Sequence, residues 1–170
     1  MRAYHFRSLV EADLSLIAHW RAAQHVREWW GAPSAEDERE KLADPRIAMW
    51  IVELDGRPFA FAQDYDVHGW TPHPFSYLPP RSRGIDQYIG EVDMLDQGHG
   101  SAFVRQHVER LFACGAPAVG TDPHPSNARA RRAYEKAGFA VTSGPLDTPW
   151  GRAVLMECWP KRIAPQTVNA

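Results

Sequence analysis

Two glycines stand where a loop passes into the strongest predicted helix of the chain. The run Gly98-His99-Gly100-Ser101 precedes an apolar stripe of helical spacing. Glycine lets a backbone approach a ligand closely, and the N–H groups and dipole of a helix start favour a phosphate. The same two glycines would also be found at a flexible helix start that binds no ligand. The sequence has no Gly-Lys-Ser/Thr motif and no complete dinucleotide-binding fingerprint, so nucleotide binding of those two kinds is disfavoured.

The elements around these glycines are expected to alternate between strands and helices. The helix Gly98–Cys114 carries apolar residues at i, i+4, i+7 and i+8, and Gly115 ends it. A second helix is expected from a Ser126 cap through Ala137. The strands expected in this half are Gly84–Gly90, Ala118–Thr121, Phe139–Thr142 and Ala153–Trp159.

The first half of the chain is expected to supply short helices and a hairpin. Apolar, β-prone runs flank Asp55-Gly56, which is a hairpin signal. The stretch Asp64–Arg83 is rich in proline and predicts an extended surface loop. The other elements expected are a strand at Tyr4–Leu9, helices at Glu11–Arg21, His25–Trp30 and Ala35–Leu42 (capped by Ser34), and hairpin strands at Met49–Leu54 and Pro58–Tyr65. Together they predict an α/β (α+β) fold, with a mixed sheet and helices on both faces.

Length and composition fit one globular domain over residues 1–170, with a frayed tail at 160–170. The net charge of −2 gives no general attraction to nucleic acid or to anionic membranes. We see no run long and apolar enough for a membrane span. Cys114 and Cys158 are two distant cysteines, which favour free thiols in a reducing cytoplasm over a disulfide framework or a metal site.

Two motifs in the second half are specific as a pair. They are Asp122–Ala130 (DPHPSNARA) and Tyr134–Phe139 (YEKAGF). Together with Glu28–Gly31, Arg83–Gln87 and the Ala62-Gln63 pair before Tyr65, they make the chain resemble the GNAT acetyltransferase superfamily from about Leu9 to Glu157. The resemblance is greatest to the aminoglycoside 6′-N-acetyltransferase family. It implies the GNAT fold, whose central sheet is mixed and mostly antiparallel, and the transfer of an acetyl group from acetyl-CoA to an amine.

The resemblance also implies where acetyl-CoA binds. Its pyrophosphate and pantetheine arm would be held by Gln97, Gly98, His99, Gly100, Ser101 and Asn127. Leu95 stands where the family usually has Arg or Gln, which removes one side chain and leaves the backbone donors. A strand N–H near Ile89, Gly90 and Glu91 would stabilise the oxyanion of the reaction. Arg132 would contact phosphate, although a solvated helix face would also contain it.

For catalysis, the resemblance implies Asp86 as the base and Tyr134 as the acid. An amine is mostly protonated near neutral pH, and a positioned carboxylate that takes this proton contributes roughly 10²–10⁴ in rate. Partial burial on a strand would raise the pKa of Asp86 and improve it as an acceptor. A structural Asp and a Tyr packed in the core remain the alternatives. Cys114 and Cys158 are poorly placed as nucleophiles, which favours direct transfer.

The substrate that accepts the acetyl group would lie against Trp29, Trp30 and Gln63, with Asp122 holding an amine. Asp122-Pro123 could equally form a turn. Trp150 stands where the family has a substrate-binding Asp. The loop 64–83 carries two Asp against two Arg, whereas a polycation needs an acidic site. These departures favour a less cationic, more aromatic acceptor or a narrower range of aminoglycosides.

Three functions therefore compete. The first is an aminoglycoside acetyltransferase, and the second is a related enzyme for a siderophore precursor, a polyamine or a peptide. The third is a non-catalytic module that binds acetyl-CoA, against which Asp86 and Tyr134 both argue. The expected partners are acetyl-CoA and a small-molecule amine, without nucleic acid or membrane, and possibly a second copy in a homodimer.

Overall fold

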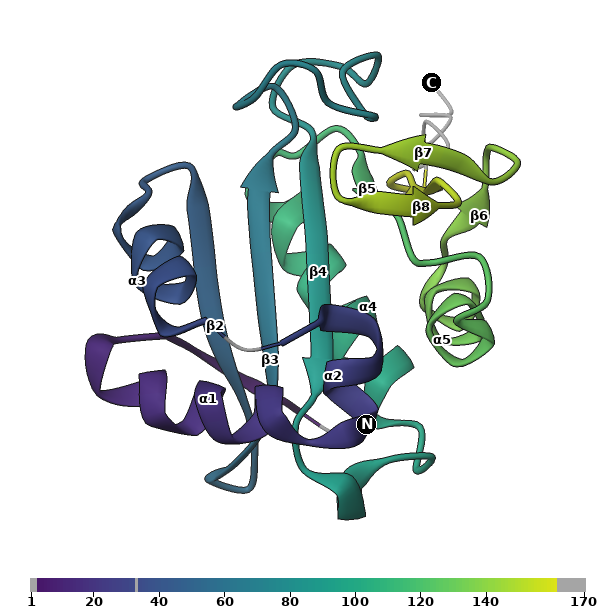
Figure 1. Cartoon of the computed structure of the whole chain (residues 1–170). Coiled ribbons are helices and arrows are strands. Elements are labelled where there is room, and N and C mark those ends of the chain that lie inside the picture. The colour runs from purple at the N-terminus through teal and green to yellow at the C-terminus, as the bar shows by residue number, and fades with distance from the viewer. Residues whose placement is uncertain (1–2, 33, 162–170) are drawn as a thin grey trace, which may run out of the picture.

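The computed structural model describes residues 3–32 and 34–161 and is built around one large sheet (Figure 1). Its strand order is β1-β2-β3-β4-β5-β9-β6. Neighbouring strands are antiparallel, except that β4 and β5 run parallel. The strands are β1 (His5–Ser8), β2 (Ile47–Leu54), β3 (Arg57–Asp66), β4 (Arg83–Ile89), β5 (Val119–Thr121), β6 (Ala140–Val141) and β9 (Met156–Cys158).

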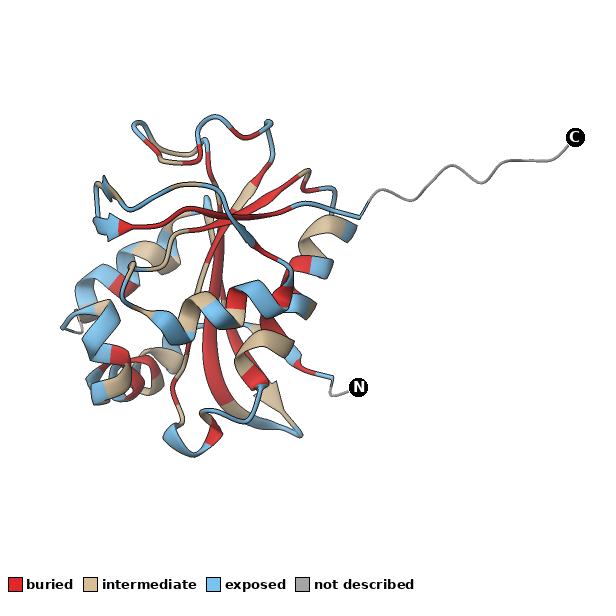
Figure 2. Ribbon diagram, turned by 90° about the vertical axis from the view of Figure 1, so that its right-hand side faces the viewer, coloured by how far each residue is buried: buried red, intermediate tan, exposed pale blue. Residues whose placement is uncertain are grey.

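Helices cover both faces of this sheet, because its central strands are apolar on both sides. Ile51, Phe61 and Tyr88 pack toward α1, α2 and α3, whereas Val52 and Ile85 pack toward α4 and α5. Figure 2 shows the buried strands between the two layers. The helices are α1 (Leu14–Ala22), α2 (Gln24–Trp30), α3 (Ala35–Ala43), α4 (His99–Ala113) and α5 (Ala128–Ala137), with short 3-10 turns at Glu11–Asp13 and Val92–Met94. The predicted fold class is confirmed.

Several local signals act as predicted, and one does not. Asp55 and Gly56 form the hairpin turn with φ of 51° and 78°. Ser34 caps α3 by accepting a hydrogen bond from the Asp37 N–H at 3.2 Å. The predicted Ser126 cap of α5 is wrong. Asn127 is the N-cap residue, and its Oδ1 accepts from the Ala130 N–H at 3.0 Å.

The structure differs most from the prediction near the C-terminus and in the long loop. A separate hairpin of β7 (Leu146–Thr148) and β8 (Gly151–Ala153) was not predicted, and β9 is shorter than the strand expected at Ala153–Trp159. The loop after β3 lacks helix and strand as predicted. It is more than a surface loop, however, because Val67, Phe75 and Leu78 are buried against Ala118 and Leu155. The frayed tail was predicted at residues 160–170, of which 162–170 lie outside the described residues.

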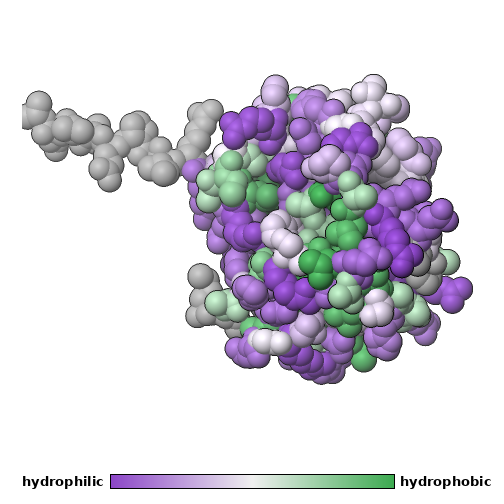
Figure 3. Space-filling model, turned by 90° about the vertical axis from the view of Figure 1, so that its left-hand side faces the viewer, coloured by the Kyte–Doolittle hydropathy of each residue, from purple (hydrophilic) through white to green (hydrophobic). Residues whose placement is uncertain are grey.

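The outer surface over α1 and α3 is mainly hydrophilic around a small apolar area (Figure 3). Within residues 3–32 and 34–161, every helix is too short or too polar to cross a membrane.

Candidate active site

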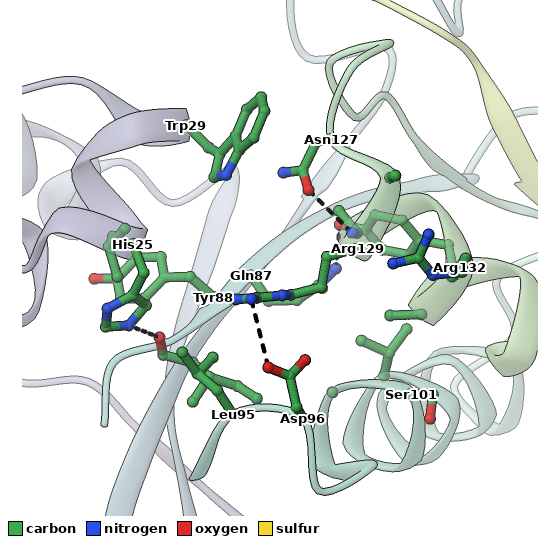
Figure 4. Close-up of a pocket in the computed structure, with 18 of the residues that line it drawn as sticks. His25, Trp29, Gln87, Tyr88, Leu95, Asp96, Ser101, Asn127, Arg129 and Arg132 are labelled. Atoms are coloured by element: carbon green, nitrogen blue, oxygen red, sulfur yellow. Dashed lines mark hydrogen bonds and ion pairs between the residues drawn. The ribbon is translucent and has the colours of Figure 1, made fainter. Parts of the chain in front are cut away.

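The site begins where β4 and β5 part. These strands pair at two positions, Arg83 with Val119 and Gly84 with Gly120. β4 continues to Ile89, so the far half of its edge is open toward β5. A cavity of about 640 Å³ lies there, lined by β4, α2, the start of α4 and α5 (Figure 4). A parallel pair that separates in this way exposes strand backbone to a ligand.

The start of α4 forms one wall of the cavity. Gly98 is its N-cap residue in the left-handed conformation, with φ of 81°, which favours glycine. A Cβ at Gly98 would meet no atom within 4 Å, and one at Gly100 would be 3.8 Å from Ile89 Cδ1. Leu95 and Ser101 also line the cavity. The backbone N–H groups of a helix start therefore adjoin an open space, which suits a pyrophosphate.

Two residues predicted to bind the cosubstrate turn their side chains elsewhere. His99 is 2% exposed, and its Nδ1 hydrogen-bonds Tyr4 Oη at 3.0 Å. The Gln97 Nε2 group donates to the backbone carbonyl of Asp93. Gln97 and His99 would therefore reach a phosphate only through their backbone. A third predicted residue, Gly90, serves close packing, because a Cβ there would lie 2.1 Å from the Trp20 ring.

The backbone hydrogen bonds at the end of β4 show which of the three predicted N–H groups is available to donate to the oxyanion. The N–H groups of Gly90 and Glu91 both donate to Phe59 O, at 2.8 and 3.2 Å, and are thus engaged. Alternate residues of a strand point their backbone groups toward opposite edges. The Ile89 N–H therefore faces the open edge, as does the Ile89 carbonyl, which accepts from His25 Nε2 at 2.9 Å. Of the three predicted residues, Ile89 is the one placed to donate.

The start of α5 forms the opposite wall. Asn127 uses Oδ1 to cap the helix, which leaves its Nδ2 group to donate to a ligand. Arg129 and Arg132 line the cavity. Arg129 forms an ion pair with Asp96 at 3.4 Å, from α5 to the loop before α4 (Figure 4). This wall offers positive charge to an anionic cosubstrate.

Asp86 lies on β4 and is partly exposed. Its Oδ2 accepts a hydrogen bond from Gln63 Nε2 at 2.9 Å, because Gln63 and Asp86 are register partners on β3 and β4. Burial raises the pKa of the Asp86 carboxyl, and the Gln63 hydrogen bond and the charge of Lys41 oppose this rise. A carboxylate with a raised pKa is a better proton acceptor near neutral pH. The geometry therefore suits a general base.

Tyr134 lies on α5 and lines the cavity, with 7% of its surface exposed. Its hydroxyl oxygen accepts a hydrogen bond from Gln87 Nε2. Burial raises the pKa of the phenol well above its ordinary value, and a hydrogen bond with Thr121 lowers it. The hydroxyl thus keeps its proton at neutral pH, as a general acid must. The Tyr134 ring also packs on the Phe139 ring, with the two centroids 5.5 Å apart. The ring therefore belongs to the core, as the alternative interpretation of Tyr134 expected.

Asp122 follows β5 directly, and Trp150 reaches it from the β7–β8 turn. The Trp150 Nε1 group donates to Asp122 Oδ2 at 2.5 Å. Burial raises the pKa of Asp122 to about 7, the charge of Asp86 adds to this, and the Trp150 hydrogen bond opposes it. Burial raises the pKa of Tyr65, and the nearby charges of Asp86 and Asp122 add to this rise. The two predicted acceptor residues, Asp122 and Trp150, thus contact each other.

The raised pKa of Asp122 predicts a pH-dependent stability. Its carboxyl has a pKa of about 7 in the fold against an ordinary value of 3.8, so the native state binds more protons between these values. The free energy of unfolding therefore falls as pH rises from about 4 to 7. We therefore expect the free energy of unfolding of Asp122→Asn, relative to that of wild type, to rise by roughly 1–2 kcal/mol between pH 5 and pH 8. This range is reduced to allow for the partial solvent exposure of Asp122.

Urea unfolding at both pH values measures this difference, with the exposed Asp147→Asn as the matched control. An Asp122→Asn effect that is equal at pH 5 and pH 8 would contradict the assignment.

The other predicted acceptor residues lie on α2. Trp29 and Trp30 both line the cavity. Trp29 is 38% exposed and lies 5.8 Å from the His124 ring. Trp30 packs edge-on against Phe61 and Tyr88, so its ring belongs partly to the core.

The sequence predicted an acceptor site with little negative charge, and the structure removes Asp64 from it as well. Asp64 lies on β3 beside Gln63 and so points to the other face of the sheet. There it is 4% exposed and accepts from Trp50, Arg83 and His107. The unforeseen neighbour of Trp150 is His73, a buried ring 5.3 Å away. The acceptor end is aromatic, with Asp86 and Asp122 as its nearby carboxylates.

The chain is similar to several known proteins. A family model described as "Acetyltransferase (GNAT) domain" matches residues 9–144. The aminoglycoside N(6′)-acetyltransferase type 1 of Klebsiella pneumoniae is 37% identical over 164 residues, covering 88% of this chain and 80% of that protein. A kanamycin resistance protein of Rhizobium radiobacter is 47% identical over 78 residues, covering 45% of this chain and 71% of the relative.

Solved structures are similar as well. AAC(6′)-Ib in complex with coenzyme A and kanamycin has a TM-score of 0.83 and 36% identity, covering 92% of this chain and 95% of that one. The same enzyme in complex with ribostamycin and coenzyme A has a TM-score of 0.85 and 34% identity, with 99% of each chain covered.

Proposed function

Because the chain belongs to the GNAT acetyltransferases, and within them to the aminoglycoside 6′-N-acetyltransferase family, we propose that it transfers the acetyl group of acetyl-CoA to the 6′-amine of an aminoglycoside. The observation that carries this proposal is the placement of Asp86 and Tyr134 beside the parted strands. The first has a raised pKa and the second keeps its proton. A module that only bound acetyl-CoA would need neither group.

The cosubstrate fits the residues present. The open space at Gly98 and Gly100 adjoins helix N–H groups, and Asn127 Nδ2 is left to donate. Arg129 and Arg132 would face the phosphates. These contacts would hold the thioester along the open edge of β4.

The protein then carries out two of the proton transfers. Asp86 takes a proton from the substrate ammonium and later releases it to solvent, and the amine nitrogen forms a bond to the thioester carbonyl carbon. The Ile89 N–H donates to the oxyanion that develops there. As the carbon–sulfur bond breaks, the nitrogen loses its second proton to solvent. Tyr134 gives its own proton to the departing thiolate and later regains one from solvent. The thioester is attacked directly, without an acyl-enzyme.

A panel of amines tests the proposed acceptor. Purified protein is incubated with acetyl-CoA and each amine, and the released thiol is detected. The panel includes kanamycin, ribostamycin, a polyamine, a peptide N-terminus and a simple aromatic monoamine. We expect turnover with aminoglycosides that carry a 6′-amine. Turnover confined to the other amines would overturn the aminoglycoside as the acceptor, but it would still support an acetyltransferase activity.

One observation favours a second candidate, an acceptor of lower charge. Trp150 already donates to Asp122, which reduces the negative charge offered to a second ammonium. Asp64 is buried on the opposite face. A monoamine or a lightly charged amino sugar would suit the aromatic acceptor end, and in the panel it would outperform kanamycin.

We place the reaction in the cytoplasm, since Cys114 and Cys158 are both free thiols. Association into a homodimer stays a prediction, which light scattering of the purified protein measures.

A further inference from the structure

Two neighbouring residues of β4 contact groups on opposite faces of the sheet. Side chains alternate along a strand, so Asp86 and Gln87 point to opposite sides of the sheet. Asp86 faces Gln63 on the side of α1–α3. Gln87 faces Tyr134 on the side of α4 and α5. The open edge of β4 lies between them, where the thioester would be held.

The contact with Gln87 limits the directions in which the Tyr134 hydroxyl can donate. A phenolic oxygen has one proton to give and two lone pairs to accept with. Gln87 Nε2 donates to this oxygen and so occupies one of its two acceptor positions. The proton of Tyr134 must therefore point away from Gln87, toward another partner.

We propose that Gln87 is a positioning residue for the acid step, which holds the Tyr134 hydroxyl so that its proton points at the departing sulfur. This inference rests on the proposed function. It assigns Gln87 a task that neither the motif nor the proposed mechanism required.

A packing role does not account for Gln87. Its Oε1 is buried and has no hydrogen-bond partner among the described residues. A buried amide oxygen left unpaired costs free energy, which an apolar side chain would avoid. Gln87 also borders the cavity and not the centre of the core. An amide at this position is therefore explained by the contact that its nitrogen makes with Tyr134.

Two variants separate donation from packing. Gln87→Met keeps the length of the side chain and loses the donor, so we expect kcat to fall about 10-fold, the effect of one hydrogen bond of about 1.4 kcal/mol. Gln87→Glu keeps the shape, but its carboxylate would accept the Tyr134 proton, so kcat should fall further. The affinity for coenzyme A, measured by calorimetry, should stay within about 3-fold in both. If packing were the role, the isosteric Gln87→Glu would be the milder change.

A double-mutant cycle with Tyr134→Phe gives the decisive readout. Without the hydroxyl, Gln87→Met should change kcat less than about 2-fold, because the group that it positions is gone. Gln63→Met is the matched control on the opposite face. It should lower kcat equally in both backgrounds, because it acts on Asp86.

Additive effects of Gln87→Met and Tyr134→Phe would overturn the inference and leave the proposed function standing. A wild type that acetylates no amine would overturn both. Thermal unfolding of each variant identifies any that fail to fold, in which case Gln87→Glu serves in the same cycle.

Discussion

Asp86→Asn is expected to lower kcat/KM for acetyl transfer by roughly 10²–10⁴-fold, the usual contribution of a positioned base. The amide can still meet Gln63 and fill the site, but it cannot take a proton from the ammonium. Burial raises the pKa of Asp86, so wild-type activity should fall as pH drops through that pKa. The variant should lose this acid limb. Initial rates across pH 5 to 9 under subsaturating amine measure both effects.

The control for this variant is Asp44→Asn, which removes a partly exposed carboxylate that pairs with Arg46 away from the cavity. It should keep wild-type turnover. If Asp86→Asn kept its acid limb and lost less than about 10-fold in rate, the base would have to be another group or solvent.

Tyr134→Phe is expected to lower kcat by about 100-fold and to leave the affinity for coenzyme A nearly unchanged. The phenyl ring keeps the contact with Phe139, so the fold is retained. What is lost is the proton for the leaving thiolate. Steady-state rates at saturating cosubstrate measure kcat, and calorimetry with coenzyme A measures binding. A loss of binding with unchanged kcat would make Tyr134 a wall of the cavity and not an acid.

The parts of the fold that short-range chemistry controls were predictable. Asp55-Gly56 forms a tight turn because both residues tolerate positive φ. The apolar stripe of α4 predicts which face of the helix is buried without knowledge of the elements that pack against it. Val104 and Val108 on this stripe are buried. Ser34 caps α3 because its hydroxyl is beside the first turn. In each case a few adjacent residues carry the whole signal.

Other features depend on contacts that are distant in sequence. The β7–β8 hairpin has short strands with little apolar pattern, and its Trp150 is held by Asp122, 28 positions away. From the sequence, Asp64 was counted among the negative charges near the acceptor, because the sequence does not show which face of the sheet each side chain of β3 occupies. One position decides whether a side chain faces the acceptor or α4. Gln87 was visible in the motif of β4, yet its partner Tyr134 comes from α5.

The same distinction holds within the candidate site. The glycines before α4 and the pair Asp86 and Tyr134 were identified from local motifs. Burial raises the pKa of Asp86 as the sequence predicted, but its hydrogen bond from Gln63 on the neighbouring strand was not predicted. Neither could the sequence tell that His99 turns into the core toward Tyr4. Motifs identified the reacting groups, and packing determined what each can do.

The most direct test of the central claim is mass spectrometry of kanamycin incubated with acetyl-CoA and either wild type or Asp86→Asn. We expect wild type to yield kanamycin with one added acetyl group, located by fragmentation on the 6′-amine. Asp86→Asn at the same concentration should yield almost none. Unmodified kanamycin with wild type, or equal acetylation by both proteins, would contradict the account.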